Sequence, residues 1–328
     1  MLRRNLAFIG ASALLVGMAA VFFVRPALAG RLSPDHFPNI ELTTQDGKKV
    51  HFYDDLIKDK IVAINLIYTH CEYACPLETA RLVQVQKILG DRVGKDIFFY
   101  SISIDPKRDT PEVMKAYMEK FHVGPGWTFL TGKKEDIDFL SKKLGLWSDP
   151  AASLDGHTPH LLIGNELTGQ WMRASAVDNP RFLSQMLGEF IDNYRNVKLT
   201  SQTTPAQPAK LNFDKGQYLF VRQCAPCHTI GGGDKIGPDL LGVTNVRQRD
   251  WLVQKLLKPD EMLADKDPIT MALNEKYKGV KMPKLRLSDE EINILIGYMV
   301  TQTSVHDREA AKPAAKTGDG AGTPNQPR

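Results

Sequence analysis

The sequence predicts a two-domain protein, in which an α/β domain with a central sheet flanked by helices precedes a small all-α domain. Two apolar, β-branched runs, at residues 61–67 and 97–104, are typical of strands buried on both faces, and a helical pattern follows each of them. A polar, proline-bearing segment at residues 199–210 lacks apolar periodicity and indicates a linker, after which only helical patterns follow. At 328 residues, the chain is also longer than one average domain.

The first domain, which we place at residues 31–198, alternates strands and helices. Pro76 begins a helical pattern after the first strand, and Thr110 and Pro111 are the residue types preferred at a helix cap and first helical position. Further along, the pattern predicts a hairpin at residues 161–172 and a helix at 180–194. The order strand, helix, strand, helix, hairpin, helix is that of the thioredoxin-like fold, which we therefore expect.

The second domain, which we place at residues 211–304, is short and helical. Asp214 can cap a helix that runs into Cys224. Near the end, Ser288 and Glu291 have the spacing of a capping box, and the apolar residues that follow recur at helical spacing. Residues 305–328 are rich in Ala, Gly, Pro, Lys and Asp, a composition that predicts a disordered tail.

The N-terminus has the pattern of an export signal. Arg3 and Arg4 precede an uncharged apolar run at residues 6–24, and Ala27 and Ala29 form a small-x-small cleavage site. The run is nearly long enough to cross a bilayer, so residues 1–29 are either a signal peptide or an N-terminal membrane anchor. We therefore expect a periplasmic protein, soluble or anchored to the inner membrane.

Charge and cysteine content narrow the function further. Removing residues 1–29 lowers the formal net charge from +4 to +1, because three arginines and no acidic residue are lost; this gives no electrostatic reason to expect nucleic acid as a partner. The four cysteines form two close pairs, Cys71 with Cys75 and Cys224 with Cys227, which leaves none for a disulfide framework. A chain that uses cysteine in this way is using it for cofactors or redox chemistry.

Residues 224–228, Cys-Ala-Pro-Cys-His, match the attachment motif of c-type haem. In that motif two thiols bond to the porphyrin vinyl groups and the next histidine binds the iron. The alternative, half of a zinc site, needs a second pair of ligands, and no other cysteine is near in sequence. The motif predicts one covalent haem c, attached by Cys224 and Cys227 with His228 on the iron.

Cys71 and Cys75 follow the first predicted strand, where the chain turns into a helix. Ligands of open α/β sheets bind at this edge. Two cysteines four positions apart fit a soft metal better than a routine disulfide switch, and thiolates select Cu(I). We expect one copper ion there; both cysteines are also candidate catalytic redox thiols. The helix N-terminus and the neighbouring His70 should lower their pKa values.

Residues 37–195 resemble the Sco/SenC family of copper-binding, thioredoxin-like proteins that act in the maturation of cytochrome c oxidase. The resemblance rests on three blocks: residues 69–76 (THCEYACP), 103–111 (SIDPKRDTP) and 127–132 (WTFLTG). It implies that a histidine from a later loop joins the two cysteines on copper. His157 has the family's position, and His160 is the competitor. This chain departs from the family at Glu72, where proline usually follows the first cysteine. A carboxylate there disfavours thiolate formation, so the metal affinity could differ from the family norm. Asp105 either lies near the metal or orients the turn that follows it.

Residues 211–302 resemble a class I cytochrome c. The resemblance rests on Gly216 and Phe220 in the first helix with Tyr298 in the last, and on Gly-Pro-x-Leu at residues 237–240. It implies that Met282, followed by Pro283, is the sixth iron ligand, with Met262 and Met271 as alternatives. A thioether ligand favours reduced iron.

Together these features predict a copper-binding redox protein or metallochaperone in the assembly of respiratory cytochrome c oxidase, with a haem domain for electron transfer. Its expected partners are the copper-bearing oxidase subunit or another copper protein, and a redox partner protein. The alternatives are a haem-linked thiol-disulfide oxidoreductase, and an electron carrier whose Sco-like domain only docks partners. Haem transfers one electron and a disulfide two, and a copper ion removes that mismatch.

Overall fold

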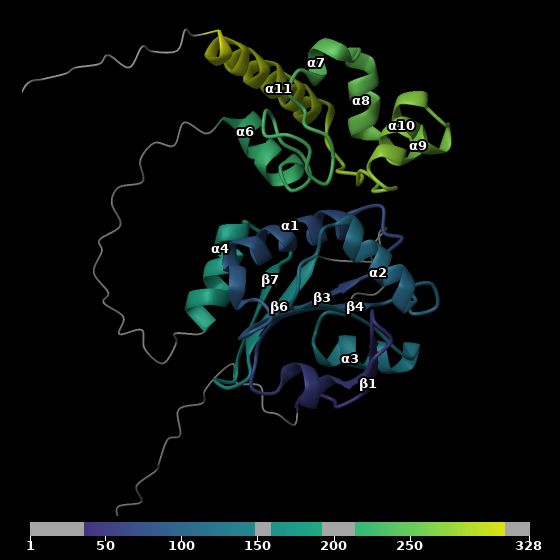
Figure 1. Ribbon diagram of the computed structural model, residues 1–328, viewed down its shortest axis with the longest axis vertical. Helices are drawn as coiled ribbons and strands as arrows, with labels where there is room; N and C mark the ends of the chain where they lie inside the picture. Colours follow the sequence, from purple (N-terminus) through teal and green to yellow (C-terminus); the bar gives the residue numbers. More distant parts are fainter. Residues whose placement is uncertain (1–35, 148–158, 192–213, 312–328) are drawn as a thin grey trace, which may run out of the picture.

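The computed structural model describes residues 36–147, 159–191 and 214–311, and it confirms the predicted fold class. An α/β part is followed by a smaller helical part, which lies over helix α1 (Ala74–Leu89) of the first part (Figure 1). The predicted export segment at residues 1–29 and the linker at 199–210 lie outside the described residues. Within those residues, no helix combines the length and apolarity needed to cross a membrane.

The α/β part is built on a mixed sheet with the strand order β2-β1-β5-β4-β3-β6-β7. The two central strands, β3 and β4, pair in parallel, as do β4 and β5, whereas β6 and β7 form the predicted antiparallel hairpin. The strands are β1 (Glu41–Thr44), β2 (Lys49–His51), β3 (Ile61–Ile67), β4 (Ile97–Ser103), β5 (Trp127–Thr131), β6 (His160–Asn165) and β7 (Gln170–Ser175).

Both faces of the sheet are covered, which explains why β3 is apolar throughout. Ile61, Ala63 and Ile67 pack with α1, α2 and α4 on one face, while Val62 and Ile64 pack with α3 on the other. In Figure 1 the helices of the two faces lie on opposite sides of the sheet, and α1 is on the side of the helical part. The helices are α1 (Ala74–Leu89), α2 (Pro111–Lys120), α3 (Lys134–Lys143) and α4 (Pro180–Gln185). Helix α4 continues as the π-helical turn η4 (Met186–Phe190). A further π-helical turn, η2 (Phe52–Ile57), follows β2, and a 3₁₀ turn, η3 (Gly90–Arg92), follows α1.

The helical part packs its first helix across its last. Gly216 and Phe220 meet Tyr298, with the two rings 5.5 Å apart, as the cytochrome c resemblance implies. The elements are α6 (Lys215–Leu219), η5 (Phe220–Cys224), α7 (Val243–Val246), α8 (Arg249–Leu257), α9 (Pro259–Ala264), α10 (Pro268–Lys276) and α11 (Asp289–Ala310).

The capping residues in the sequence predict the starts of several helices correctly, whereas the predicted end of the last helix is too early. Thr110, Asp214 and Ser288 all act as the predicted caps, and Ser288 completes its capping box with Glu291. Helix α1 begins at Ala74, before Pro76. Helix α11 continues through residues 305–310, which we expected to be disordered; neither Gly nor Pro interrupts the chain there, and Arg308 donates back to the Ser304 carbonyl.

Candidate metal and haem sites

Cys71 lies on the segment between β3 and α1, and Cys75 lies in the first turn of α1; we call residues 68–75, which contain both, the metal loop. Both side chains are buried, Cys71 with 5% and Cys75 with 0% of its surface exposed. The backbone N–H of Cys75, in the first turn of α1, donates to the Cys71 sulfur at 3.4 Å. The loop therefore brings the two sulfurs together at the carboxyl end of a central strand, where ligands of α/β sheets bind.

The pKa values of the two thiols are shifted in opposite directions from the ordinary value of a cysteine. Hydrogen bonds from the Cys75 thiol and backbone lower the pKa of Cys71 to about 6, against the opposing effect of burial. Burial, together with sharing that hydrogen bond, raises the pKa of Cys75 well above its ordinary range. Cys71 is thus the more acidic of the two thiols and the first to form a thiolate, which is the form that binds soft metals.

Asp109, which sequence reasoning did not single out, anchors the metal loop. Its buried carboxylate accepts hydrogen bonds from the Thr69 N–H at 3.1 Å and the Ser103 hydroxyl at 2.5 Å, and the Thr69 hydroxyl donates at 2.5 Å to its other oxygen. His70 Nδ1 lies 3.7 Å from that oxygen. Of our two expectations for Asp105, the structure supports the local one: its carboxylate pairs with Arg108 and its carbonyl accepts from Asp109 N–H.

The third copper ligand that we expect, His157, lies outside the described residues. His160 begins β6, which runs antiparallel to β3 with Leu161 opposite Asn65. His160 is thus at the same edge of the sheet as the metal loop. In the parts of the chain that the structure describes, no three His, Cys, Asp or Glu side chains gather as a metal site.

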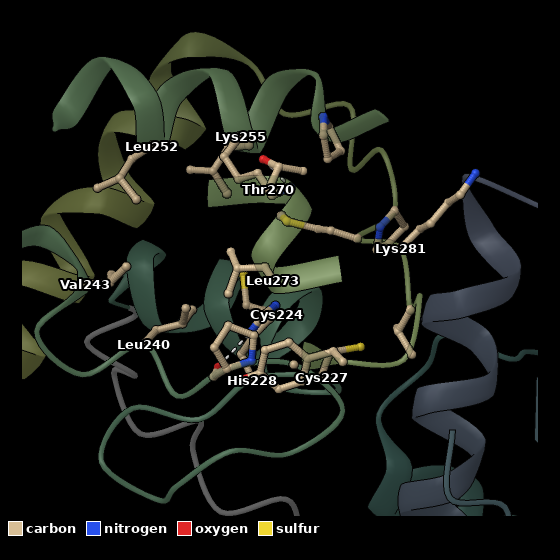
Figure 2. A pocket seen from close by; sticks show the side chains of 18 of the residues that line it. Cys224, Cys227, His228, Leu240, Val243, Leu252, Lys255, Thr270, Leu273 and Lys281 are labelled. Atoms are coloured by element: carbon tan, nitrogen blue, oxygen red, sulfur yellow. Dashed lines mark hydrogen bonds between the residues drawn. The ribbon is translucent and has the colours of Figure 1, made fainter. Parts of the chain in front are cut away.

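The Cys224–His228 motif lines a mostly apolar cavity of about 290 Å³, close to the lower end of the range for ligand pockets. Figure 2 shows Cys224, Cys227 and His228 together on one side of it, with Leu252 and other side chains of the helices opposite. Burial raises the pKa of each of these thiols to about 12, so both are protonated before attachment.

His228 is oriented as a metal ligand. Its Nδ1 lies 2.8 Å from the Pro238 carbonyl oxygen, which accepts the ring proton and leaves Nε2 with a free lone pair. Burial lowers the His228 pKa, which favours the neutral, ligating imidazole. A Cβ at residue 237 would lie 2.6 Å from His228 Cε1, so only glycine lets the chain pass this close to the ring.

Met282 lines the same cavity, whereas Met262 and Met271 do not. Met299 also lines it but belongs to the core of the helical part. Thus Cys224, Cys227, His228 and Met282, which the sequence predicts as haem residues, surround one cavity whose apolar lining fits a porphyrin. Glu72 of the metal loop lines this cavity too, a proximity that the sequence does not reveal.

Comparisons with known proteins divide the chain in the same way. Residues 31–158 match the family model of SCO1/SenC, and residues 213–303 match that of cytochrome c. An SCO2-like protein of Rickettsia felis is 29% identical over 158 residues, which are 45% of this chain and 74% of that protein.

Two solved structures are also similar. A SCO1/SenC family lipoprotein from Bacillus anthracis is 27% identical with a TM-score of 0.40, over 46% of this chain and 92% of that one. ScoI of Bradyrhizobium japonicum with copper bound is 27% identical with a TM-score of 0.38, over 45% of this chain and 94% of that one. By the two family-model matches, the chain joins an SCO1/SenC domain at residues 31–158 to a C-terminal cytochrome c domain at residues 213–303.

Proposed function

We propose that the protein binds copper at the metal loop and acts as a copper-delivering redox protein in the assembly of the copper centre of cytochrome c oxidase. The observation that carries the proposal is the buried thiolate–thiol pair of Cys71 and Cys75, at a ligand-binding edge of an SCO1/SenC domain. A soft donor pair of this kind selects Cu(I) over harder ions. The oxidase subunit that bears copper, or another copper protein, would receive the ion.

Each predicted residue has one role in this proposal. Cys71, Cys75 and His157 would hold one copper ion. Cys224 and Cys227 would attach one haem c, and His228 and Met282 would be its iron ligands. Haem bound there supplies a one-electron couple for electron transfer with a redox partner. The mostly apolar lining of the cavity would shield a porphyrin from water, and the Pro238 carbonyl holds His228 in the ligating tautomer.

We place this chemistry in the periplasm, on the pattern of Arg3, Arg4 and the apolar run at residues 6–24. The protein is then either released by cleavage after Ala29 or held at the inner membrane by its N-terminus. Sequencing the N-terminus of the protein purified from the periplasmic and membrane fractions distinguishes the two.

Copper binding is tested by titrating the reduced protein with Cu(I) in competition with a chelator. We expect one Cu(I) per chain, loss of binding in Cys71→Ser, and a far larger loss of affinity in His157→Ala than in His160→Ala. If His160→Ala loses copper while His157→Ala keeps it, the assignment of the third ligand is wrong. If Cys71→Ser retains full affinity, the copper site is elsewhere.

Haem attachment is tested on the same exported protein. We expect the haem to resist acid-acetone extraction, because thioether bonds are covalent, and the sulfur-to-iron absorption band of the oxidised protein to disappear in Met282→Ala. Met271→Ala is the matched control and should keep the band. Extraction of the haem, or an unchanged band in Met282→Ala, contradicts the assignment.

A second function, thiol-disulfide exchange with a client, is favoured by the lowered pKa of Cys71, because a thiolate is the attacking species. In that reaction the Cys71 thiolate attacks the client disulfide and releases one client thiolate. Cys75, as a thiolate, then displaces the second, leaving a Cys71–Cys75 disulfide. Cys75→Ser should trap the mixed disulfide. Failure to trap it, with Cu(I) binding intact in the wild type, favours the copper function.

A further inference from the structure

Glu72 connects the metal loop to the segment that carries Met282. Its carboxylate Oε1 lies 3.1 Å from Lys281 Nζ, and its backbone carbonyl accepts the N–H of Lys284 at 3.0 Å. These two contacts bracket Met282 and Pro283 in the segment between α10 and α11, which we call the Met282 loop (residues 277–288). Figure 2 shows the Lys281 side chain extending towards the end of α1.

The neighbouring Tyr73 widens this contact. Lys284 Nζ lies 5.7 Å and the Arg286 guanidinium 5.3 Å from the centre of its ring, both within the range of cation–π attraction. Lys284 is itself held by Asp260, at 2.6 Å. The Met282 loop thus rests on two consecutive residues of the metal loop, through charge, a backbone hydrogen bond and an aromatic face.

Helix α1, which begins at the metal loop, also holds the other iron-ligand segment. Arg81 is 3% exposed and donates to the carbonyls of Val221 and Arg222, at 3.2 and 2.6 Å. Gln84 donates to the Ala225 carbonyl at 3.1 Å. These carbonyls lie in and just after the helical turn that ends at Cys224, where a cation is favoured by the helix dipole. A buried guanidinium with these acceptors indicates a specific docked arrangement.

Apolar packing closes the same interface. Ile236, from the segment after the haem-binding motif, is buried in the core cluster of the α/β part, and Val280 of the Met282 loop packs against that cluster. The metal loop and α1 therefore contact the chain on both sides of the haem cavity. Glu72 directly follows Cys71 in the chain, so the residue that holds the Met282 loop is separated from a candidate metal-binding sulfur by a single peptide bond.

We propose that Glu72 is a positioning residue that couples the cysteine pair to Met282, so that a metal ion on the cysteines and the hold of Met282 on the haem iron influence each other. The proposal rests on the proposed function, since it takes Cys71 and Cys75 as metal ligands and Met282 as the sixth iron ligand. Such coupling is reciprocal by thermodynamic linkage. The Glu72–Lys281 pair is partly exposed, at 38% and 51%, so its own contribution is modest.

The experiment uses the haem protein with oxidised iron, reduced thiols and no copper. It measures how fast imidazole displaces Met282 from the iron, followed by loss of the sulfur-to-iron absorption band. Glu72→Gln and Lys281→Gln should each accelerate displacement about twofold to fivefold, the range expected for a partly exposed ion pair. The charge reversal Glu72→Lys with Lys281→Glu should restore the rate. Glu41→Gln is the matched control, because Glu41 on β1 forms an exposed ion pair with Lys49 on β2, and it should leave the rate unchanged.

Coupling is then tested with Ag(I), a soft ion that binds thiolates and, unlike Cu(I), does not reduce the haem. Ag(I) should change the wild-type displacement rate at least about twofold, an effect of the size of one such ion pair, and this change should shrink in Glu72→Gln. Cys71→Ser with Cys75→Ser should abolish it. Equal rates in wild type and Glu72→Gln, or an Ag(I) effect that persists in full in Glu72→Gln, overturn the proposal.

Haem content and thiol-dependent Ag(I) binding, measured on every variant, separate this proposal from the one it rests on. If the wild-type protein lacks haem or does not bind Ag(I) through its thiols, both the coupling and the proposed function are contradicted. Normal haem and normal Ag(I) binding with no effect of Glu72 contradict only the coupling. Because Lys281 and Glu72 are on different domains, agreement between their variants excludes misfolding of one domain as the cause.

Discussion

The pKa of Cys71 is lowered and that of Cys75 is raised because the two residues occupy different positions relative to α1. Cys71 precedes the helix and receives the Cys75 N–H, whereas Cys75 is within the first turn and fully buried. Hydrogen bonding stabilises the charged form of the first thiol, and desolvation penalises the charged form of the second. Glu72 lies between the two cysteines in the sequence, and the pKa of Cys71 is lowered despite this neighbouring carboxylate.

The first prediction follows from these acidities. Carbon-13 NMR of the cysteine β-carbons in the reduced, metal-free protein should show Cys71 titrating with a midpoint of about 6 and Cys75 titrating well above the ordinary thiol range. A lowered pKa means that Cys71 is ionised above pH 6 and protonated below it. Copper must displace the proton of Cys75 throughout this range and, below pH 6, that of Cys71 as well. Apparent Cu(I) affinity should therefore fall as the pH drops, and below pH 6 the protonation of Cys71 should steepen the fall by up to about a further tenfold per pH unit.

Cys71→Ser and Cys75→Ser identify the two resonances. Cys75→Ala removes the side chain that donates to Cys71, so the Cys71 midpoint should rise in that variant. Two midpoints near about 8.5, the ordinary value for a free cysteine, would contradict the predicted asymmetry.

At the scale of elements, the haem domain depends on the crossing of α6 and α11. A Cβ at residue 216 would lie 2.7 Å from the Cβ of Tyr298, so the two helices approach as closely as glycine permits. Gly297, one residue before Tyr298, is exposed and would place a Cβ in open space. An added Cβ would therefore clash with the neighbouring helix at Gly216 but meet no atom at Gly297.

The second prediction compares these glycines in the holoprotein. Gly216→Ala should destabilise the haem domain by about 1–3 kcal/mol, because the added methyl group forces the helices apart. Gly297→Ala should stabilise it by about 0.5–1 kcal/mol, because alanine loses less entropy in a helix interior. Urea unfolding followed by haem absorbance measures both. A smaller loss for Gly216→Ala than for Gly297→Ala would show that the crossing is not close.

At the scale of the whole molecule, the two domains form one interface around the haem cavity. Arg81 is central to it, since its side chain belongs to α1 and its acceptors, Val221 and Arg222, belong to the cytochrome c domain. Hydrogen bonds to a charged donor contribute about 1.5–3 kcal/mol each when buried. Losing them should shift the balance between docked and separated domains.

The third prediction uses the Lys284 N–H, which is bonded to the Glu72 carbonyl only when the domains are docked. In Arg81→Gln, hydrogen–deuterium exchange of this amide should accelerate about tenfold or more, because each 1.4 kcal/mol changes the opening equilibrium tenfold. Arg92→Gln is the control: Arg92 donates to the Gly188 carbonyl within the SCO1/SenC domain, and its loss should leave the Lys284 amide unchanged. Equal exchange in both variants would mean that Arg81 does not hold the domains together.

Features that depend on neighbouring residues could be predicted from the sequence alone. The Cys224–His228 motif is contiguous, and the caps at Thr110, Asp214 and Ser288 act within three residues, so chain connectivity alone brings their groups together. The buried runs of β3 and β4 are likewise visible, because strands covered on both faces must be apolar throughout.

Contacts between residues far apart in the chain could not be predicted in this way and follow from the three-dimensional fold. Asp109 lies 40 positions from Thr69, and Glu72 lies 209 positions from Lys281, yet each pair is in contact. Asp109 in the sequence has the appearance of a residue before a helix cap, and Glu72 that of a departure from its family. Such contacts depend on how parallel strands align at one edge of the sheet and on how two domains dock. These arrangements are set by the packing of whole surfaces, so the spacing of residues along the chain carries no record of them.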